Sequence, residues 1–160
     1  MRKTILGSVT ATPTMGSCLD LAAIARVEVS SETASQPIEA ALLEGAALGW
    51  KAAVPGIQRV RLVFDSAQTI RAIMLQIDEH EHVRSQEFVL RWQGEGDSHF
   101  RDIVRQQFNF SPPGTTQELE SYQVELFQVK VLELIINPDT GSGPSCAGLT
   151  KLRLYAGRLS

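Results

Sequence analysis

Residues 49–110 of the 160-residue chain read GWKAAVPGIQRVRLVFDSAQTIRAIMLQIDEHEHVRSQEFVLRWQGEGDSHFRDIVRQQFNF, and they carry the clearest signal of its secondary structure. It contains four runs typical of strands, each ending at turn residues, and no helix longer than a few turns fits inside it. In the first run Val60, Leu62 and Phe64 alternate with two arginines and Val63, so one face of the strand is apolar and the other is mostly charged. Residues 73–77 and 88–92 repeat this alternation. The stretch predicts an all-β domain.

On either side of this stretch, the sequence predicts a first strand at 24–30 and later strands at 122–126, 129–137 and 149–155. About eight short antiparallel strands are typical of a jelly-roll β-sandwich. Residues 1–22 are weakly patterned, so we expect an N-terminal lead-in there, followed by one domain over 23–160. We expect one shared interior to contain Val60, Leu62, Phe64, Ile73, Leu75, Ile77, Phe88, Leu90, Trp92, Leu134, Ile136, Leu152 and Leu154.

The pattern resembles the discoidin-like family, the galactose-binding-like domains of the coagulation-factor C-domain type. The resemblance rests on Trp50 after a Gly-containing loop, the strand QRVRLVFD, the polar turn SAQ and the strand TIRAIMLQID. Downstream, EFVLRWQGEGDSHF is similar to the family's strand, turn and aromatic-bearing strand. The resemblance implies a jelly-roll sandwich that acts as a non-catalytic binding module, with carbohydrate or a carbohydrate-like molecule as its ligand.

Charge and composition limit the partners. Lys and Arg number 15 against 18 Asp and Glu, so the chain lacks the basic excess that a general nucleic-acid partner requires. No apolar run is long enough to span a bilayer, and we expect no membrane association. The N-terminal ILGSVTATPTMG is too interrupted for a secretory signal, which favours the cytoplasm. There Cys18 and Cys146 are expected to be thiols, with a disulfide between them as the alternative.

The resemblance also implies where a sugar would bind, because carbohydrate-binding relatives use the loops at one end of the sandwich. The loop at 78–85 is rich in polar side chains that can pair with vicinal hydroxyls. Trp50 is the candidate ring for stacking, although it could instead pack in the core. The candidate ligand-binding residues are Trp50, His80, Glu81, His82 and Arg84. Binding that depends on the histidines should change between roughly pH 5.5 and 7.5.

A rival function is an intracellular protein-interaction or self-association module, and the sequence leaves the oligomeric state open. Arginines recur at positions expected to face outward from consecutive strands, and their planar groups suit bidentate contacts with a partner. The alternative is a solvated face with cross-strand ion pairs. These arginines are Arg59, Arg61, Arg71, Arg84, Arg91, Arg101 and Arg105.

We expect no metal and no other cofactor. His80 and His82 are two apart, as a metal pair on an extended chain would be, but the sequence offers only His99 besides. Many discoidin-like domains hold calcium, yet Leu48 and Lys151 stand where the resemblance would place ligands of that ion. Glu44, followed by Gly45, is the acidic residue that remains.

Catalysis is not expected either, and no catalytic residue is predicted. The chain has no Gly-x-Ser-x-Gly elbow, no phosphate-binding Gly-rich loop with Lys and no His-Glu-x-x-His. Asp78 and Glu79 are adjacent, so on a strand they point to opposite sides and cannot act as a matched acid and base.

Overall fold

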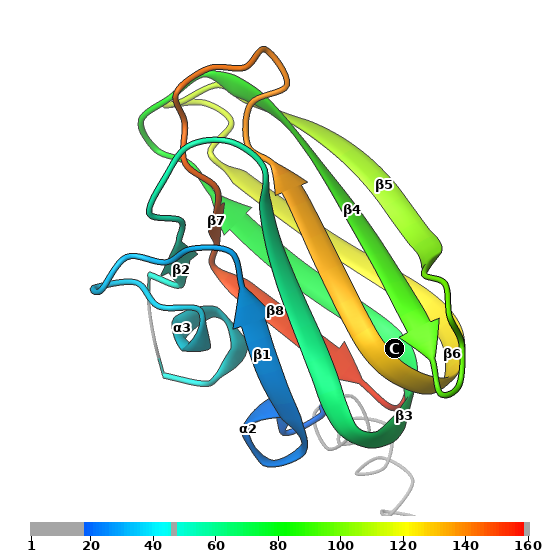
Figure 1. The fold of residues 1–160 in the computed structure, drawn as a ribbon. Helices are drawn as coiled ribbons and strands as arrows, with labels where there is room; N and C mark the ends of the chain where they lie inside the picture. Colours follow the sequence, from blue (N-terminus) through cyan, green and yellow to red (C-terminus); the bar gives the residue numbers. More distant parts are fainter. Residues whose placement is uncertain (1–17, 46–47, 159–160) are drawn as a thin grey trace, which may run out of the picture.

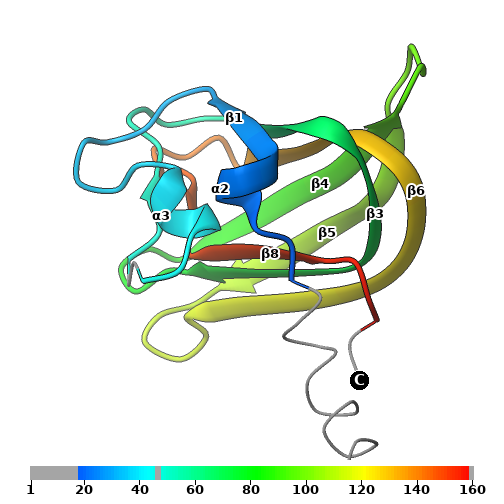
Figure 2. The same cartoon turned by 90° about the horizontal axis from the view of Figure 1, so that it is seen from below.

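Two long strands form the frame of the molecule, seen in a computed structural model that describes residues 18–45 and 48–158 (Figure 1). They are β3 (Gln58–Asp78) and β6 (Gln117–Asn137), which pair antiparallel with each other. Register shifts interrupt this pairing between Val63 and Ala72 of β3. Extra residues at such irregularities increase bend and twist. Both strands therefore curve from one layer of the sandwich into the other, as Figure 2 shows.

One layer has the strand order β1-β3-β6-β4-β5 and uses the first half of β3 with the second half of β6. Its other strands are β1 (Ala25–Val29), β4 (Arg84–Gly94) and β5 (Arg101–Phe110). The second layer adds β8 (Lys151–Tyr155) to the remaining halves of β3 and β6. β2 (Trp50–Lys51) and β7 (Gly148–Leu149) pair separately. The predicted all-β jelly-roll sandwich is confirmed.

The helices in the described part of the chain are single turns, α2 (Leu21–Ile24) and α3 (Glu39–Leu42). Neither is long or apolar enough to cross a bilayer. The described part of the predicted lead-in packs against the sandwich, because Leu19 donates its N–H to the Leu154 carbonyl at 2.8 Å and Leu21 is buried. Residues 1–17 of that lead-in lie outside the described residues.

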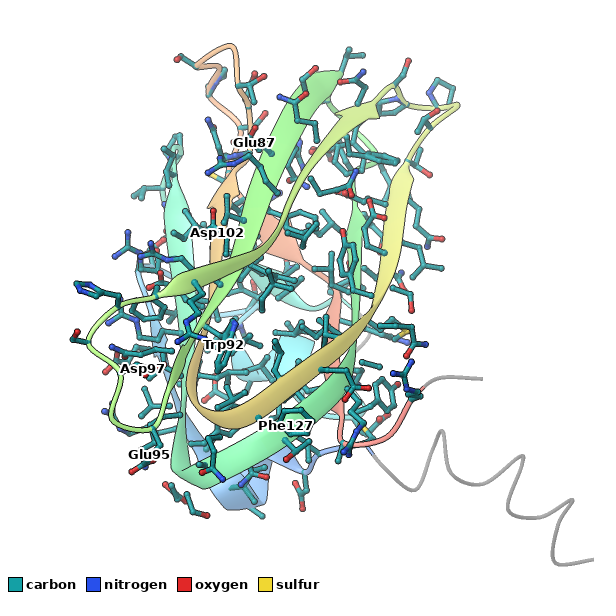
Figure 3. The ribbon with its side chains drawn as sticks, turned by 90° about the vertical axis from the view of Figure 1, so that its right-hand side faces the viewer. Glu87, Trp92, Glu95, Asp97, Asp102 and Phe127 are labelled. Atoms are coloured by element: carbon teal, nitrogen blue, oxygen red, sulfur yellow. The ribbon has the colours of Figure 1, made fainter. Side chains whose placement is uncertain are left out.

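Two predicted pairs of strands are single strands in the structure. The turn expected at 66–68 is part of β3, and the strands expected at 122–126 and 129–137 both belong to β6. The sequence signal was an interruption of the alternation, which a bulge produces as well as a turn. At the bend of β6, Gln128 has a φ of 60°, next to the half-exposed ring of Phe127 (Figure 3).

The predicted interior is confirmed, except that Trp92 is only partly buried. The other twelve predicted core residues are each at most 2% exposed. Trp92 packs against the core on the side of the sandwich between β5 and β6, which faces the viewer in Figure 3. The Arg101 guanidinium lies 5.4 Å from the centre of the Trp92 ring and partly covers it.

The outer face of the five-stranded layer carries an ion-pair network. Glu133 is fully buried there, and its pKa is lowered although burial opposes ionisation, because it accepts hydrogen bonds from Arg61 and Arg91. Arg59 lies 3.5 Å from the same carboxylate. The Phe100 ring stacks over Arg61 and Arg91. The arginines of this face are thus engaged within the molecule, as the alternative of cross-strand ion pairs predicted.

Candidate functional site

The loop between β3 and β4 lies at the end of the sandwich that also carries the β2–β7 pair (Figure 1). A hollow of about 220 Å³ opens there, and we call it the first hollow. Its walls come from four separate segments of the chain. They are Gln36, Leu48, Trp50, Lys51, Asp78, His80, Arg84, Gly148, Leu149 and Thr150.

Asp78 provides a fixed negative charge in the first hollow. Its carboxylate accepts hydrogen bonds from Thr150 at 2.7 Å, Gln76 at 2.8 Å and Gln117 at 3.1 Å. Partial burial opposes ionisation, but these donors outweigh it and lower the pKa of Asp78. The strand ends of β3 and β6 thus hold an ionised hydrogen-bond acceptor in a fixed position at the first hollow.

Arg84 is buried behind the first hollow, so the expectation that it faces outward is wrong. Its side chain is 2% exposed, and its Nε donates to Glu79 at 2.7 Å. Its Nη1 donates to the Gln86 side chain and to the Pro138 carbonyl, at 2.8 and 2.6 Å. The guanidinium also stacks on the Phe110 ring. With these donors engaged, Arg84 shapes the wall of the hollow and does not project a free fork.

The partner of Arg84 organises the loop itself. Burial opposes ionisation of Glu79, yet its pKa is lowered because Arg84 and the N–H groups of Glu81 and His82 donate to its carboxylate. The loop after β3 is therefore wrapped around one buried acid. This explains why a segment of polar residues has a defined shape.

A second buried acid continues this polar chain into the interior. Gln86 accepts from Arg84 and donates its Nε2 to Glu118 Oε1 at 2.9 Å. Glu118 is fully buried, and the described structure gives its Oε2 no hydrogen-bond partner. Burial and the neighbouring Glu120 carboxyl raise the pKa of Glu118 to about 8. Glu118 is therefore protonated at neutral pH.

Trp50 does not offer a stacking face, which corrects one part of the predicted site. Its ring is 1% exposed, and its Nε1 donates to the Ser31 carbonyl at 2.9 Å. Trp50 contributes to the wall of the first hollow, but the ring belongs to the core, as the alternative interpretation predicted. The exposed apolar side chain at this hollow is Leu48, at 73%.

Of the three remaining candidates, only His80 lines the first hollow. His80 is exposed and lines the first hollow together with Trp50 and Arg84. Glu81 and His82 are exposed on the same loop, with 3.8 Å between Glu81 Oε2 and His82 Nε2, but they do not line the hollow. The structure thus brings three of the five candidates together. Their role in binding stays a prediction.

Sequence reasoning missed Gln36, Lys51 and Thr150, which also line the first hollow. Lys51 and Thr150 reach it through the two-residue strands β2 and β7 and the residue that follows β7. Strands this short leave no periodicity to detect. The one sequence feature that could have indicated Lys51 is its position directly after Trp50.

Metal ligands do not gather in the described part of the chain, where no three His, Cys, Asp or Glu side chains form a group that could hold an ion. Glu44, the acidic position of the resemblance to calcium-binding relatives, lies 3.5 Å from the Arg153 guanidinium. Arg153 also donates to the carbonyls of Ala41 and Leu43. Cys18 and Cys146 are both thiols, so the disulfide alternative is not adopted in the structure.

Comparisons with known proteins identify the fold. No family model matches the sequence, and no curated protein matches it significantly. Among solved structures, the family 32 carbohydrate-binding module of C. perfringens NanJ, in complex with galactose, is 10% identical with a TM-score of 0.61, covering 87% of this chain and 98% of that one. An F5/8 type C domain from Bacteroides fragilis is 20% identical with a TM-score of 0.58, covering 89% and 97%.

A Ruminococcus gnavus GH29 fucosidase in complex with fucose has a TM-score of 0.67 at 10% identity, covering 97% of this chain but 30% of the fucosidase chain. Identities this low show the fold alone. The chain therefore has the galactose-binding-like jelly-roll fold of the discoidin-like domains and family 32 carbohydrate-binding modules.

Proposed function

We propose that this chain is a non-catalytic carbohydrate-binding module that takes a sugar unit into the first hollow. The observation that carries the proposal is the combination in one hollow of the Asp78 carboxylate, the Lys51 ammonium and the His80 ring. Several similar structures are carbohydrate-binding modules solved with a sugar, including galactose and an unsaturated mannuronic acid. They support the ligand class.

The chemistry of the hollow suits a polyol. Asp78 accepts from hydroxyls, and Lys51 and His80 can donate to them. The exposed Leu48 offers an apolar surface to the C–H groups of a ring, where many sugar sites use an aromatic side chain. At about 220 Å³ the hollow lies below the usual size of sites for drug-sized ligands, so it suits a single sugar unit.

The test is calorimetric titration with the best sugar from a glycan array, using variants matched on the same loop. Lys51→Ala and His80→Ala each remove a donor from the hollow, and we expect each to weaken binding by about tenfold or more. His82→Ala removes the same ring type two residues away, outside the hollow, and should leave affinity unchanged. Equal effects of His80→Ala and His82→Ala would contradict the proposed site.

A further inference from the structure

A second hollow of about 330 Å³ lies at the same end of the sandwich. It forms where the segment before β3 meets the segment after β6. None of its lining residues lines the first hollow. They are Pro55, Gly56, Ile57, Asn137, Pro138, Asp139, Ser142 and Gly143.

The second hollow combines aliphatic side chains with polar groups, a combination that suits a sugar ring. Ile57 is 63% exposed, and the two prolines extend the apolar surface beside it. In the segment after β6, Asn137, Asp139 and Ser142 supply amide, carboxylate and hydroxyl groups to the same hollow. The same division between an exposed aliphatic residue and polar side chains occurs in the first hollow, where Leu48 is the exposed aliphatic residue.

The polar side of the second hollow is held in shape before any ligand arrives. Asp139 Oδ1 accepts the Gly141 N–H at 2.9 Å, and a Cβ on Gly143 would lie 2.0 Å from Asp139 Oδ2. Ser142 is held at a φ of 62°, in the left-handed region. The Thr140 N–H donates to the Ser85 carbonyl at 2.8 Å and ties the loop to β4. A preformed loop loses less entropy when a ligand binds.

The two hollows are direct neighbours. Arg84 lines the first, and it donates to the carbonyl of Pro138, which lines the second. Lys51 of the first hollow is four residues from Pro55 of the second, a separation that an extended chain spans in about 14 Å at most. One ligand made of several linked rings can therefore contact both.

We infer that the second hollow is a subsite for neighbouring units of the same glycan, so that the module recognises an oligosaccharide and not an isolated terminal sugar. This inference rests on the proposed function. It predicts that affinity rises with the length of the ligand, because contacts at the second hollow are added without a second loss of translational freedom.

The test compares single sugars with oligosaccharides of two to six units by calorimetry, using galactose, galacturonate and mannuronate series. We expect oligosaccharides to bind at least tenfold more tightly than the corresponding single sugar, with one ligand per chain. Ile57→Ser should reduce oligosaccharide affinity towards that of the single sugar and leave single-sugar affinity unchanged. Val83→Ser is the matched control, since Val83 is 75% exposed in the loop before β4 but lines neither hollow, and it should change nothing.

Three results would overturn the inference while leaving the proposed function intact. They are equal affinity at every length, an Ile57→Ser variant that binds oligosaccharides like the parent, and two single sugars bound per chain. Absence of binding across all three series would contradict the proposed function itself, and the subsite inference, which rests on it, would be wrong as well.

Discussion

Replacing Glu118 with Gln should make the protein more stable, and only above acidic pH. In the folded chain the pKa of Glu118 rises from its usual 4.5 to about 8, because of burial and the neighbouring Glu120 carboxyl. Between these two values the folded state keeps a proton that the unfolded state releases. The free energy of unfolding therefore falls as pH rises from 4.5 to 8, and is constant in this respect below and above that window.

The size of the effect follows from the same two values. Each tenfold difference in proton affinity is worth about 1.4 kcal/mol, so the rise to about 8 corresponds to at most roughly 5 kcal/mol. The neighbouring Glu120 carboxyl contributes part of this rise, and we expect roughly 2 to 4 kcal/mol in practice. Glu118→Gln keeps an oxygen for Gln86 Nε2 and carries no charge. The variant should match the parent at pH 4 and exceed it by this amount at pH 9.

The assay is urea unfolding of the parent and Glu118→Gln at pH 4, 5, 6, 7, 8 and 9. Glu95→Gln is the control, because Glu95 is exposed in the hairpin between β4 and β5 (Figure 3). It should follow the parent at every pH. If Glu118→Gln loses stability with rising pH as steeply as the parent does, the Glu118 carboxyl is not the cause of the pH dependence.

Four further predictions test the fold and the walls of the site. Phe64→Ala should cost about 2 to 5 kcal/mol in urea unfolding, because Phe64 is fully buried, and a variant that unfolds like the parent would refute the strand register. Calcium should leave the melting temperature of the parent within a degree or so of an EDTA control, and a calcium-dependent rise would contradict the absence of a calcium site. Arg153→Ala should lower the melting temperature by several degrees, because the variant loses the hydrogen bonds that Arg153 donates to the carbonyls of Ala41 and Leu43. Trp50→Phe should cost about 1 kcal/mol of stability, because it loses the hydrogen bond to the Ser31 carbonyl, and it should retain sugar binding. A folded variant that no longer binds sugar would indicate that Trp50 stacks on the ligand after all.

The interior could be predicted because period-two alternation reports directly which face of a strand is buried. That signal placed Leu62, Leu75 and Leu90 correctly. It could not separate a bulge from a turn, which is why β3 and β6 were each divided in two. It also placed Arg84 outward, since a charged side chain is exposed by default. The buried partner that reverses this default, Glu79, belongs to a loop whose shape no periodicity encodes.

The site could be predicted only in part for a similar reason. His80 was recognised from local composition, because the loop after β3 is unusually polar. Lys51 and Thr150 become its neighbours through pairing between segments almost a hundred residues apart, and that pairing leaves no local trace. Ile57 and Asp139 of the second hollow likewise meet only after β3 and β6 have paired.

Because β3 and β6 run through both layers, the two layers are coupled when the protein unfolds. Each layer contains half of each long strand, so neither layer can be removed as an intact fragment. The innermost pair of this ladder, Asp78 with Gln117, is separated by 39 residues of sequence and the outer pair, Gln58 with Ile136, by 78 (117 − 78 and 136 − 58). Closing loops of this size precedes most of the stabilising contacts, which slows folding. The two layers should therefore be lost together in one cooperative transition, and the hollows at the loop end should persist until the whole sandwich unfolds.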